Sequence, residues 1–155
     1  MGQSLNLVAD LPDAASTEAL GRQLADRLPA DTRGWAILLQ GELGTGKSTL
    51  ARAMLRALGH PGPVPSPTYT LVEPYEVAGR LVYHVDLYRL SDERELEYLG
   101  WSDLDDGLIL VEWPERAPSL EAQADLAIRL SYAGRGRAAL LVPLSARGAE
   151  LLAAA

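Results

Sequence analysis

A glycine-rich octapeptide carries the clearest chemical signal in this sequence. Residues 41–48 read GELGTGKS, which fits the G-x-x-x-x-G-K-[ST] pattern of phosphate-binding loops. Its glycines let the backbone curl so that its N–H groups face an anion. In such a loop Lys47 reaches the β- and γ-phosphates of ATP, and the Ser48 hydroxyl ligates Mg²⁺. The residues that we expect to contact ATP or ADP here are Gly41, Glu42, Leu43, Gly44, Thr45, Gly46, Lys47, Ser48 and Thr49.

The segments on both sides of the octapeptide favour this interpretation over a glycine-rich turn that binds nothing. Residues 35–39 are apolar and predict a buried strand. Residues 48–58 are strong helix formers, and the start of a helix attracts anions through its free N–H groups and its dipole. Of the 14 basic residues, only Lys47 is a lysine. An ammonium is a compact point charge, unlike the planar guanidinium of arginine, so the single lysine stands where a phosphate-binding loop requires one.

Two acidic residues end predicted strands further along the chain. A strand over 81–87 carries Asp86, and a buried strand over 108–111 is followed by Glu112. Ligands of open α/β sheets bind at the carboxyl ends of strands, and P-loop enzymes use a carboxylate to hold Mg²⁺. We therefore predict Ser48, Asp86 and Glu112 as metal ligands and Lys47, Asp86 and Glu112 as catalytic residues, without deciding which acid positions the attacking water. The alternative for either acid is a charge at the edge of the sheet.

Four further polar features have two interpretations each. His84 shares a strand face with Asp86 and either orients it or simply packs. Thr17, in the first turn of a helix, caps that helix unless it has another role. A loop around Thr68 either senses the γ-phosphate as a switch or is a proline-stiffened connection. A basic cluster contacts nucleotide or a partner, or it keeps a hairpin soluble; its members are Arg129, Arg135 and Arg137, of which we include Arg137 among the nucleotide-binding residues.

The remaining pattern predicts one α/β P-loop domain over residues 1–155. Its sheet is expected to be mixed, mostly parallel and flanked by helices, with a C-terminal β-hairpin. A helix should begin after Asp13 or Ser16 as N-cap and present leucines at helical spacing. Other elements are expected as a strand over 4–8, a hairpin over 70–75 and 81–87, an acidic helix over 91–99 with Asp92 and Glu95 as capping box, a hairpin over 126–132 and 139–144, and a tail helix over 148–155.

Composition and charge restrict the class of protein. The 155 residues are 48% hydrophobic and 23% charged, as in ordinary globular domains. Without a run of 18 apolar residues or a signal-peptide pattern, we expect no membrane association and a cytoplasmic location. The absence of cysteine excludes disulfides and zinc–thiolate sites. A net charge of −7 argues against a chain that grips nucleic acid by itself.

Several sequence blocks, taken together, resemble the TsaE (YjeE) family of small bacterial P-loop ATPases. In order they are GELGTGKST at 41–49, SPTYTLVE at 66–73, HVDLYRL at 84–90 and VEWPE at 111–115. A weaker match is LPD at 11–13 followed by TEALG at 17–21. The matches extend over nearly the whole chain, and the second and fourth blocks are far more specific than the P-loop.

This resemblance implies a function in making threonylcarbamoyladenosine, the tRNA modification beside the anticodon. TsaE-like proteins bind a TsaD–TsaB pair and hydrolyse ATP to support turnover of that complex. TsaD-like and TsaB-like proteins are therefore the implied partners, and tRNA is reached only through them. The resemblance also implies roles for single residues. Lys47 and Ser48 would bind phosphate and Mg²⁺, Glu112 would complete the metal site, and Asp86 would be required for ATPase activity. Trp113 would lie near the nucleotide, Thr17 would lie near the adenosine, and the loop around Thr68 would act as a switch. Ser48 stands where many members have threonine and keeps the hydroxyl.

Two other functions fit the P-loop. A small-molecule kinase needs an arginine-bearing lid and an acceptor pocket, and the candidate lid over 115–125 contains only Arg116. A nucleotide-sensing module would change its partner affinity on binding ATP without hydrolysing it. Phosphorylated small products would identify the first, and partner binding without a turnover defect would identify the second.

Overall fold

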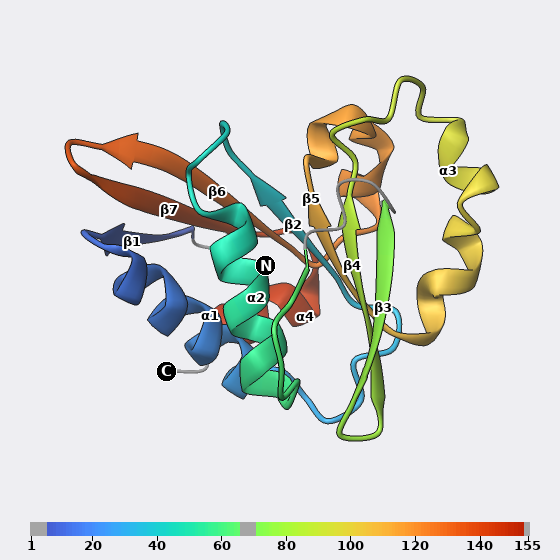
Figure 1. Cartoon of the computed structure of the whole chain (residues 1–155), viewed down its shortest axis with the longest axis horizontal. Coiled ribbons are helices and arrows are strands. Elements are labelled where there is room, and N and C mark those ends of the chain that lie inside the picture. Colours follow the sequence, from blue (N-terminus) through green and yellow to red (C-terminus); the bar gives the residue numbers. More distant parts are fainter. Residues whose placement is uncertain (1–5, 66–70, 154–155) are drawn as a thin grey trace.

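The centre of the molecule is a run of parallel strands that brings the predicted strand ends to one edge of a sheet (Figure 1). The computed structural model describes residues 6–65 and 71–153. The strands are β1 (Leu7–Leu11), β2 (Ala36–Gln40), β3 (Val72–Val77), β4 (Arg80–Asp86), β5 (Leu108–Glu112), β6 (Leu126–Ala133) and β7 (Gly136–Pro143). Their order in the sheet is β1-β7-β6-β2-β5-β4-β3.

The expected mixed sheet is confirmed, but its parallel part is confined to the middle. Strands β6, β2, β5 and β4 run parallel to their neighbours within this group. The outer pairings β1–β7, β7–β6 and β4–β3 are antiparallel. Both predicted hairpins are therefore present, and each adds antiparallel strands to the parallel centre. The sheet is evenly mixed rather than mostly parallel.

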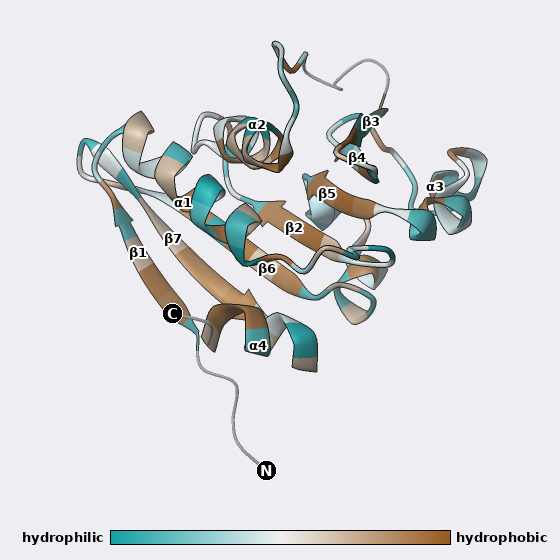
Figure 2. Ribbon diagram, turned by 90° about the horizontal axis from the view of Figure 1, so that it is seen from below, coloured by the Kyte–Doolittle hydropathy of each residue, from teal (hydrophilic) through white to brown (hydrophobic). Residues whose placement is uncertain are grey.

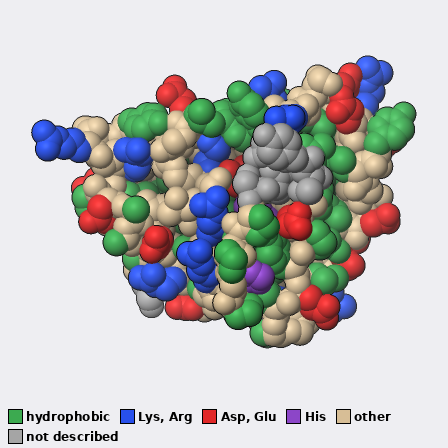
Figure 3. Space-filling model, viewed as in Figure 1, with side chains coloured by type: hydrophobic (Ala, Val, Ile, Leu, Met, Phe, Trp, Pro, Cys, Tyr) green, Lys and Arg blue, Asp and Glu red, His purple; other side chains and the backbone are tan. Residues whose placement is uncertain are grey.

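Helices and 3₁₀ turns cover the two faces of this sheet. They are α1 (Ala14–Arg27), α2 (Lys47–Leu58), α3 (Glu95–Tyr98), η1 (Trp101–Asp106), η2 (Pro114–Arg116), η3 (Pro118–Ala122) and α4 (Ala146–Ala153). Alternate residues of one strand enter two different cores: Ile37 packs with leucines of α1 and α2, whereas Leu38 packs with η1 and η3. Figure 2 shows the central strands as hydrophobic and the helices as amphipathic. In the face seen in Figure 3, basic side chains gather over α2, which carries Arg52 and Arg56.

Helix α1 begins as the sequence predicts and packs closely on α2. Of the two candidate caps, Asp13 is the one used: its Oδ1 accepts the Ser16 backbone N–H at 2.8 Å and the Ser16 hydroxyl at 2.7 Å. Gly21 permits close approach of the two helices, because a Cβ there would lie 2.8 Å from the Ala53 Cβ. The middle of α1 is thereby held against the middle of α2.

Several element boundaries differ from the sequence prediction, including β3 and β7, which lie at Val72–Val77 and Gly136–Pro143 rather than 70–75 and 139–144. Strand β1 lies at Leu7–Leu11 rather than 4–8, and residues 1–5 are outside the described part of the chain. The acidic helix shrinks to the single turn Glu95–Tyr98, because the Asp92 carboxylate binds the N–H and guanidinium of Arg94 instead of forming a capping box. The tail helix starts earlier, at Ala146. Among the described helices, none has the length and apolar character needed to cross a membrane.

Candidate nucleotide site

The glycine-rich loop lies between β2 and α2, in the predicted strand–loop–helix order. Gly41, Gly44 and Gly46 have φ values of 149°, 82° and 108°, a region that other residues rarely adopt. A Cβ on Gly41 would lie 2.5 Å from Thr45 Oγ1 and 2.6 Å from Leu130 O, so the loop is also packed tightly there. Helix α2 starts at Lys47, which puts its free N–H groups at the loop.

Lys47 is folded over its own loop. Its Nζ donates hydrogen bonds to the carbonyl oxygens of Gly41 at 2.5 Å and Glu42 at 3.0 Å, and it lies 4.1 Å from the centroid of the Trp113 ring. The residue is only 5% exposed. Burial lowers the pKa of the ammonium, while the negative charge of Glu112, followed by Glu115 and Asp86, opposes that shift. The only lysine is therefore held at the mouth of the loop beside an aromatic ring.

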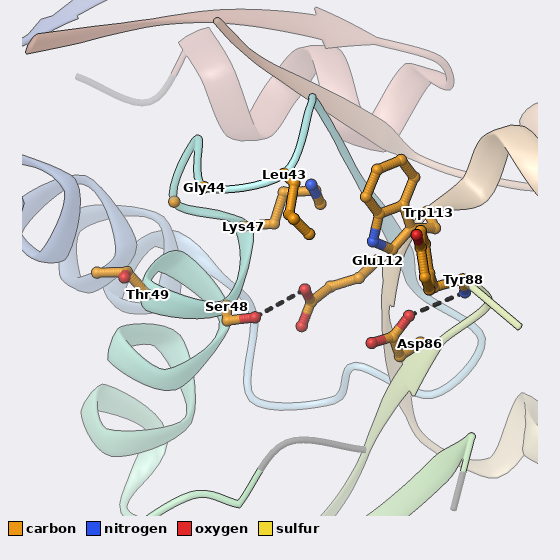
Figure 4. Close-up of a pocket in the computed structure, with 10 residues that line it drawn as sticks. Leu43, Gly44, Lys47, Ser48, Thr49, Asp86, Tyr88, Glu112 and Trp113 are labelled. Carbon is orange, nitrogen blue, oxygen red and sulfur yellow. Dashed lines mark hydrogen bonds between the residues drawn. The ribbon is translucent and has the colours of Figure 1, made fainter. Parts of the chain in front are cut away.

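Glu112 joins the loop to the sheet. It ends β5, is buried, and its Oε1 accepts the Ser48 hydroxyl at 2.8 Å (Figure 4). Its Oε2 lies 2.6 Å from Nε2 of His84, a fully buried residue of β4. Because a carboxylate only accepts hydrogen bonds, Nε2 is the donor. His84 thus orients Glu112 and not Asp86, the partner that strand alternation suggests.

Asp86 lies next to Glu112 in the parallel pairing of β4 and β5. Its Oδ1 accepts the backbone N–H of Tyr88 at 2.9 Å, as Figure 4 shows. The Tyr88 ring is 5.0 Å from the Trp113 ring, centroid to centroid. The backbone of Trp113 has a φ of 59°. Such a value is unusual for a bulky residue, and residues with such strained backbone angles cluster at functional sites. A cavity of about 340 Å³ opens among these groups and is lined by Leu43, Gly44, Gly46, Lys47, Ser48, Thr49, Asp86, Tyr88, Glu112 and Trp113.

A second cavity adjoins the other side of the loop. It has about 200 Å³, shares Gly44, Gly46 and Thr49 with the first, and extends to Thr17 and Arg137. Thr17 is buried and does not cap α1, since Asp13 does. Every predicted loop residue except Gly41 and Glu42 lines one of the two cavities, and Thr45 lines the second. Thr68 and the predicted switch over 66–70 lie outside the described residues.

The predicted basic cluster does not exist as one group. Arg129 pairs with Leu140 and Arg137 with Tyr132 in the β6–β7 register, so the two arginines lie on opposite faces of the hairpin. Arg129 binds Gln40 and Glu121, whereas Arg137 binds the Gly44 carbonyl. The sequence reasoning also missed Tyr88 and Tyr132 at the site. Tyr88 is within the HVDLYRL block, which was the available signal for it.

A parallel strand leading through a glycine-rich loop into a helix, with an acid from the adjacent strand beside the loop serine, defines an α/β domain of the P-loop class. A crystal structure of Bacillus subtilis YdiB has the same fold, with a TM-score of 0.76, 23% identity and coverage of 99% of this chain and 95% of that one.

Sequence comparison gives the family. Residues 11–139 match the profile described as threonylcarbamoyl adenosine biosynthesis protein TsaE. Relatives that bear the name tRNA threonylcarbamoyladenosine biosynthesis protein TsaE include proteins from Haemophilus influenzae and Synechocystis. The one from Haemophilus influenzae is 39% identical over 153 residues, covering 96% of this chain and 97% of the relative. The one from Synechocystis is 45% identical over 119 residues, covering 73% of each. This chain belongs to the TsaE family.

Proposed function

We propose that this chain binds and hydrolyses ATP with Mg²⁺ in tRNA threonylcarbamoyladenosine biosynthesis, acting on a complex of TsaD-like and TsaB-like proteins. The observation that carries the proposal is the 2.8 Å hydrogen bond between Ser48 and Glu112. It brings the hydroxyl of the loop and the acid of a neighbouring strand to one point, at the mouth of a cavity lined by Lys47. The family membership supplies the pathway.

The side chains at that point fit magnesium. Mg²⁺ prefers oxygen ligands, commonly one or two carboxylates together with phosphate oxygens and water. Ser48 and Glu112 provide a hydroxyl and a carboxylate already in contact, and Asp86 is the register neighbour of Glu112. Ser48 and Glu112 would hold the ion, directly or through water, and Mg²⁺ supplies neutralisation of charge on the β- and γ-phosphates.

The other groups have separate roles in this proposal. Loop N–H groups and the start of α2 bind the phosphates. The Lys47 ammonium stabilises the negative charge on the β- and γ-phosphates as the bond between them breaks. Both oxygens of Glu112 are engaged, one by Ser48 and one by His84. We assign the positioning of the attacking water to Asp86, which neighbours Glu112 in the sheet and lines the same cavity. Thr17 and Arg137 border the second cavity, which we assign to the nucleoside.

Partners and tRNA follow from family and charge. With a net charge of −7, the chain lacks the overall positive charge that holds phosphate backbones. Contact with tRNA through the TsaD-like and TsaB-like partners is consistent with that balance. A cytoplasmic location remains a prediction from the sequence.

The test is ATP hydrolysis by the purified chain, alone and with purified TsaD-like and TsaB-like partners, together with repeated rounds of threonylcarbamoyladenosine formation on tRNA. We expect slow hydrolysis alone, faster hydrolysis in the complex, and loss of both hydrolysis and repeated modification in Lys47→Ala and Glu112→Gln. Normal hydrolysis in either variant would refute the role of that residue. A phosphorylated small molecule as product would indicate the kinase, and full modification with a non-hydrolysable ATP analogue would indicate the sensing module.

A further inference from the structure

Two side chains near the tip of the β6–β7 hairpin form hydrogen bonds with backbone carbonyls of the glycine-rich loop. The Tyr132 hydroxyl donates a hydrogen bond to the Leu43 carbonyl. The Arg137 guanidinium donates two to the Gly44 carbonyl, from Nε at 3.3 Å and Nη2 at 3.2 Å. Tyr132 and Arg137 are partners in the strand register, and the guanidinium lies 4.4 Å from the tyrosine ring centroid. One hairpin therefore binds two consecutive carbonyls of the loop, which lies beside it in Figure 1.

These contacts fix the direction of loop amides. Because a peptide unit is planar and trans, its C=O and the following N–H point in opposite directions. A donor on the Leu43 carbonyl therefore turns the Gly44 N–H away from Tyr132. A donor on the Gly44 carbonyl likewise sets the Thr45 N–H, which closes the turn onto the Glu42 carbonyl at 3.2 Å. Gly44 lines both cavities, so the orientation of its peptide units matters on both sides.

The loop needs such external support. Three of its residues are glycines with positive φ, and glycine is the residue with the largest conformational freedom to lose. Only a residue without a side chain fits beside Tyr132 at position 44, because a Cβ on Gly44 would lie 2.8 Å from the Tyr132 hydroxyl oxygen. A glycine at this position leaves room for the tyrosine to reach the backbone.

We propose that Tyr132 and Arg137 are positioning residues that hold the loop in its phosphate-binding conformation, so that they raise affinity for ADP and ATP without taking part in hydrolysis. The inference rests on the proposed function of the loop. A loop that is already ordered loses less conformational entropy when the nucleotide binds, and affinity is therefore higher. The hydrogen bonds are made to the carbonyl side of the loop, so their loss should change nucleotide affinity and KM more than kcat.

The experiment measures ADP affinity with Mg²⁺ by calorimetry, and KM and kcat for ATP, in hairpin variants. Tyr132→Phe removes one hydrogen bond and no charge, and we expect ADP binding about fivefold weaker. Arg137→Met should weaken it by about tenfold or more, and Arg137→Lys, which keeps the charge and one donor, by less. In Tyr132→Phe, kcat at saturating ATP should stay within about twofold of the unaltered chain.

Matched controls lie on the opposite face of the same hairpin. Ser131→Ala removes a hydroxyl, and Arg129→Gln removes a charge whose hydrogen-bond partners are side chains outside the loop. Both should bind ADP like the unaltered chain. Unchanged affinity in Tyr132→Phe would overturn the proposal, and weakening in Arg137→Met alone would mean that the arginine contacts nucleotide directly instead. If the unaltered chain bound no ADP, the proposed function would fail first and the positioning role with it.

Discussion

At the scale of single residues, the site depends on a line of three side chains. Ser48 binds one oxygen of Glu112 and His84 binds the other, so the carboxylate is fixed at both ends. His84 is fully buried, and its Nδ1 has no hydrogen-bond partner in the described part of the chain. Among the described residues, the imidazole ring therefore has a hydrogen bond to Glu112 alone. In the proposed function, Glu112 held in this way would present its carboxylate to Mg²⁺ in one orientation, as residues that hydrogen-bond to metal ligands usually ensure.

Replacing His84 separates this role from simple packing. His84→Leu fills the space but removes the donor, whereas a glutamine side chain can place an N–H near the position of Nε2. We expect the Mg²⁺ concentration for half-maximal ATP hydrolysis to rise about tenfold or more in His84→Leu and distinctly less in His84→Gln. Urea unfolding of both variants checks that they are equally folded. An unchanged Mg²⁺ requirement in His84→Leu would show that the histidine only packs.

At the scale of elements, one buried acid anchors the end of the sheet opposite the glycine-rich loop. Asp125 precedes β6 and is 3% exposed. Its carboxylate accepts the Ala36 N–H at 3.0 Å, the Ser145 hydroxyl at 2.7 Å and the Arg147 Nε at 2.7 Å. These contacts connect the start of β2 to the segment that leads from β7 into α4. Strand β2 is the one that delivers the glycine-rich loop, so its anchorage bears on the site.

Asp125→Ala should reduce the free energy of unfolding by about 2–4 kcal/mol, because it leaves buried donors without an acceptor. Urea denaturation measures the difference. The matched control is Asp31→Ala, which removes an exposed carboxylate paired with Arg33 and should leave the midpoint almost unchanged, as exposed ion pairs contribute little. Equal effects of the two substitutions would contradict the anchoring role of Asp125.

A second contact between elements titrates at high pH. The Tyr83 hydroxyl of β4 donates to Asp106 of η1 at 2.7 Å, and this hydrogen bond, followed by burial and nearby acids, raises the pKa of Tyr83 to about 12. The raised pKa means that the contact stabilises the fold below the ordinary tyrosine pKa of about 10 and loses this effect as the pH rises toward 12. The absorbance of tyrosinate in the unaltered chain and in Tyr83→Phe should therefore be nearly equal at about pH 11. A deficit of one tyrosinate in the variant at that pH would contradict the shift.

At the scale of the whole molecule, local patterns in the sequence predicted the parts that place the site. The apolar run before the loop, the helix formers after it and the acids at strand ends fixed β2, α2, Asp86 and Glu112, because each depends on neighbours within a few residues. The parallel strands then bring these ends to one edge of the sheet. Both hairpins were also predictable, since each strand pair is joined by a glycine-containing turn.

Contacts between distant parts of the chain were not predictable in this way. Strand alternation assigned His84 a face but could not show that its partner is Glu112 on the next strand, 28 residues away. The hydrogen bonds from Tyr132 and Arg137 to the loop span 89 and 93 positions of the sequence, respectively. No periodic pattern encodes such contacts. The acidic helix was overpredicted because the predicted capping box does not form: the Asp92 carboxylate accepts the N–H and the guanidinium of Arg94, and Glu95 accepts the Ser91 hydroxyl.

We propose above all that the loop over 41–48, with Lys47 and Ser48, binds a magnesium-complexed adenine nucleotide. The decisive measurement is calorimetric titration of ADP into the purified chain with Mg²⁺. We expect saturable binding with one ADP per chain, and its loss in Lys47→Ala while that variant stays folded. No heat of binding to the unaltered chain at millimolar ADP, or equal binding by the variant, would contradict it.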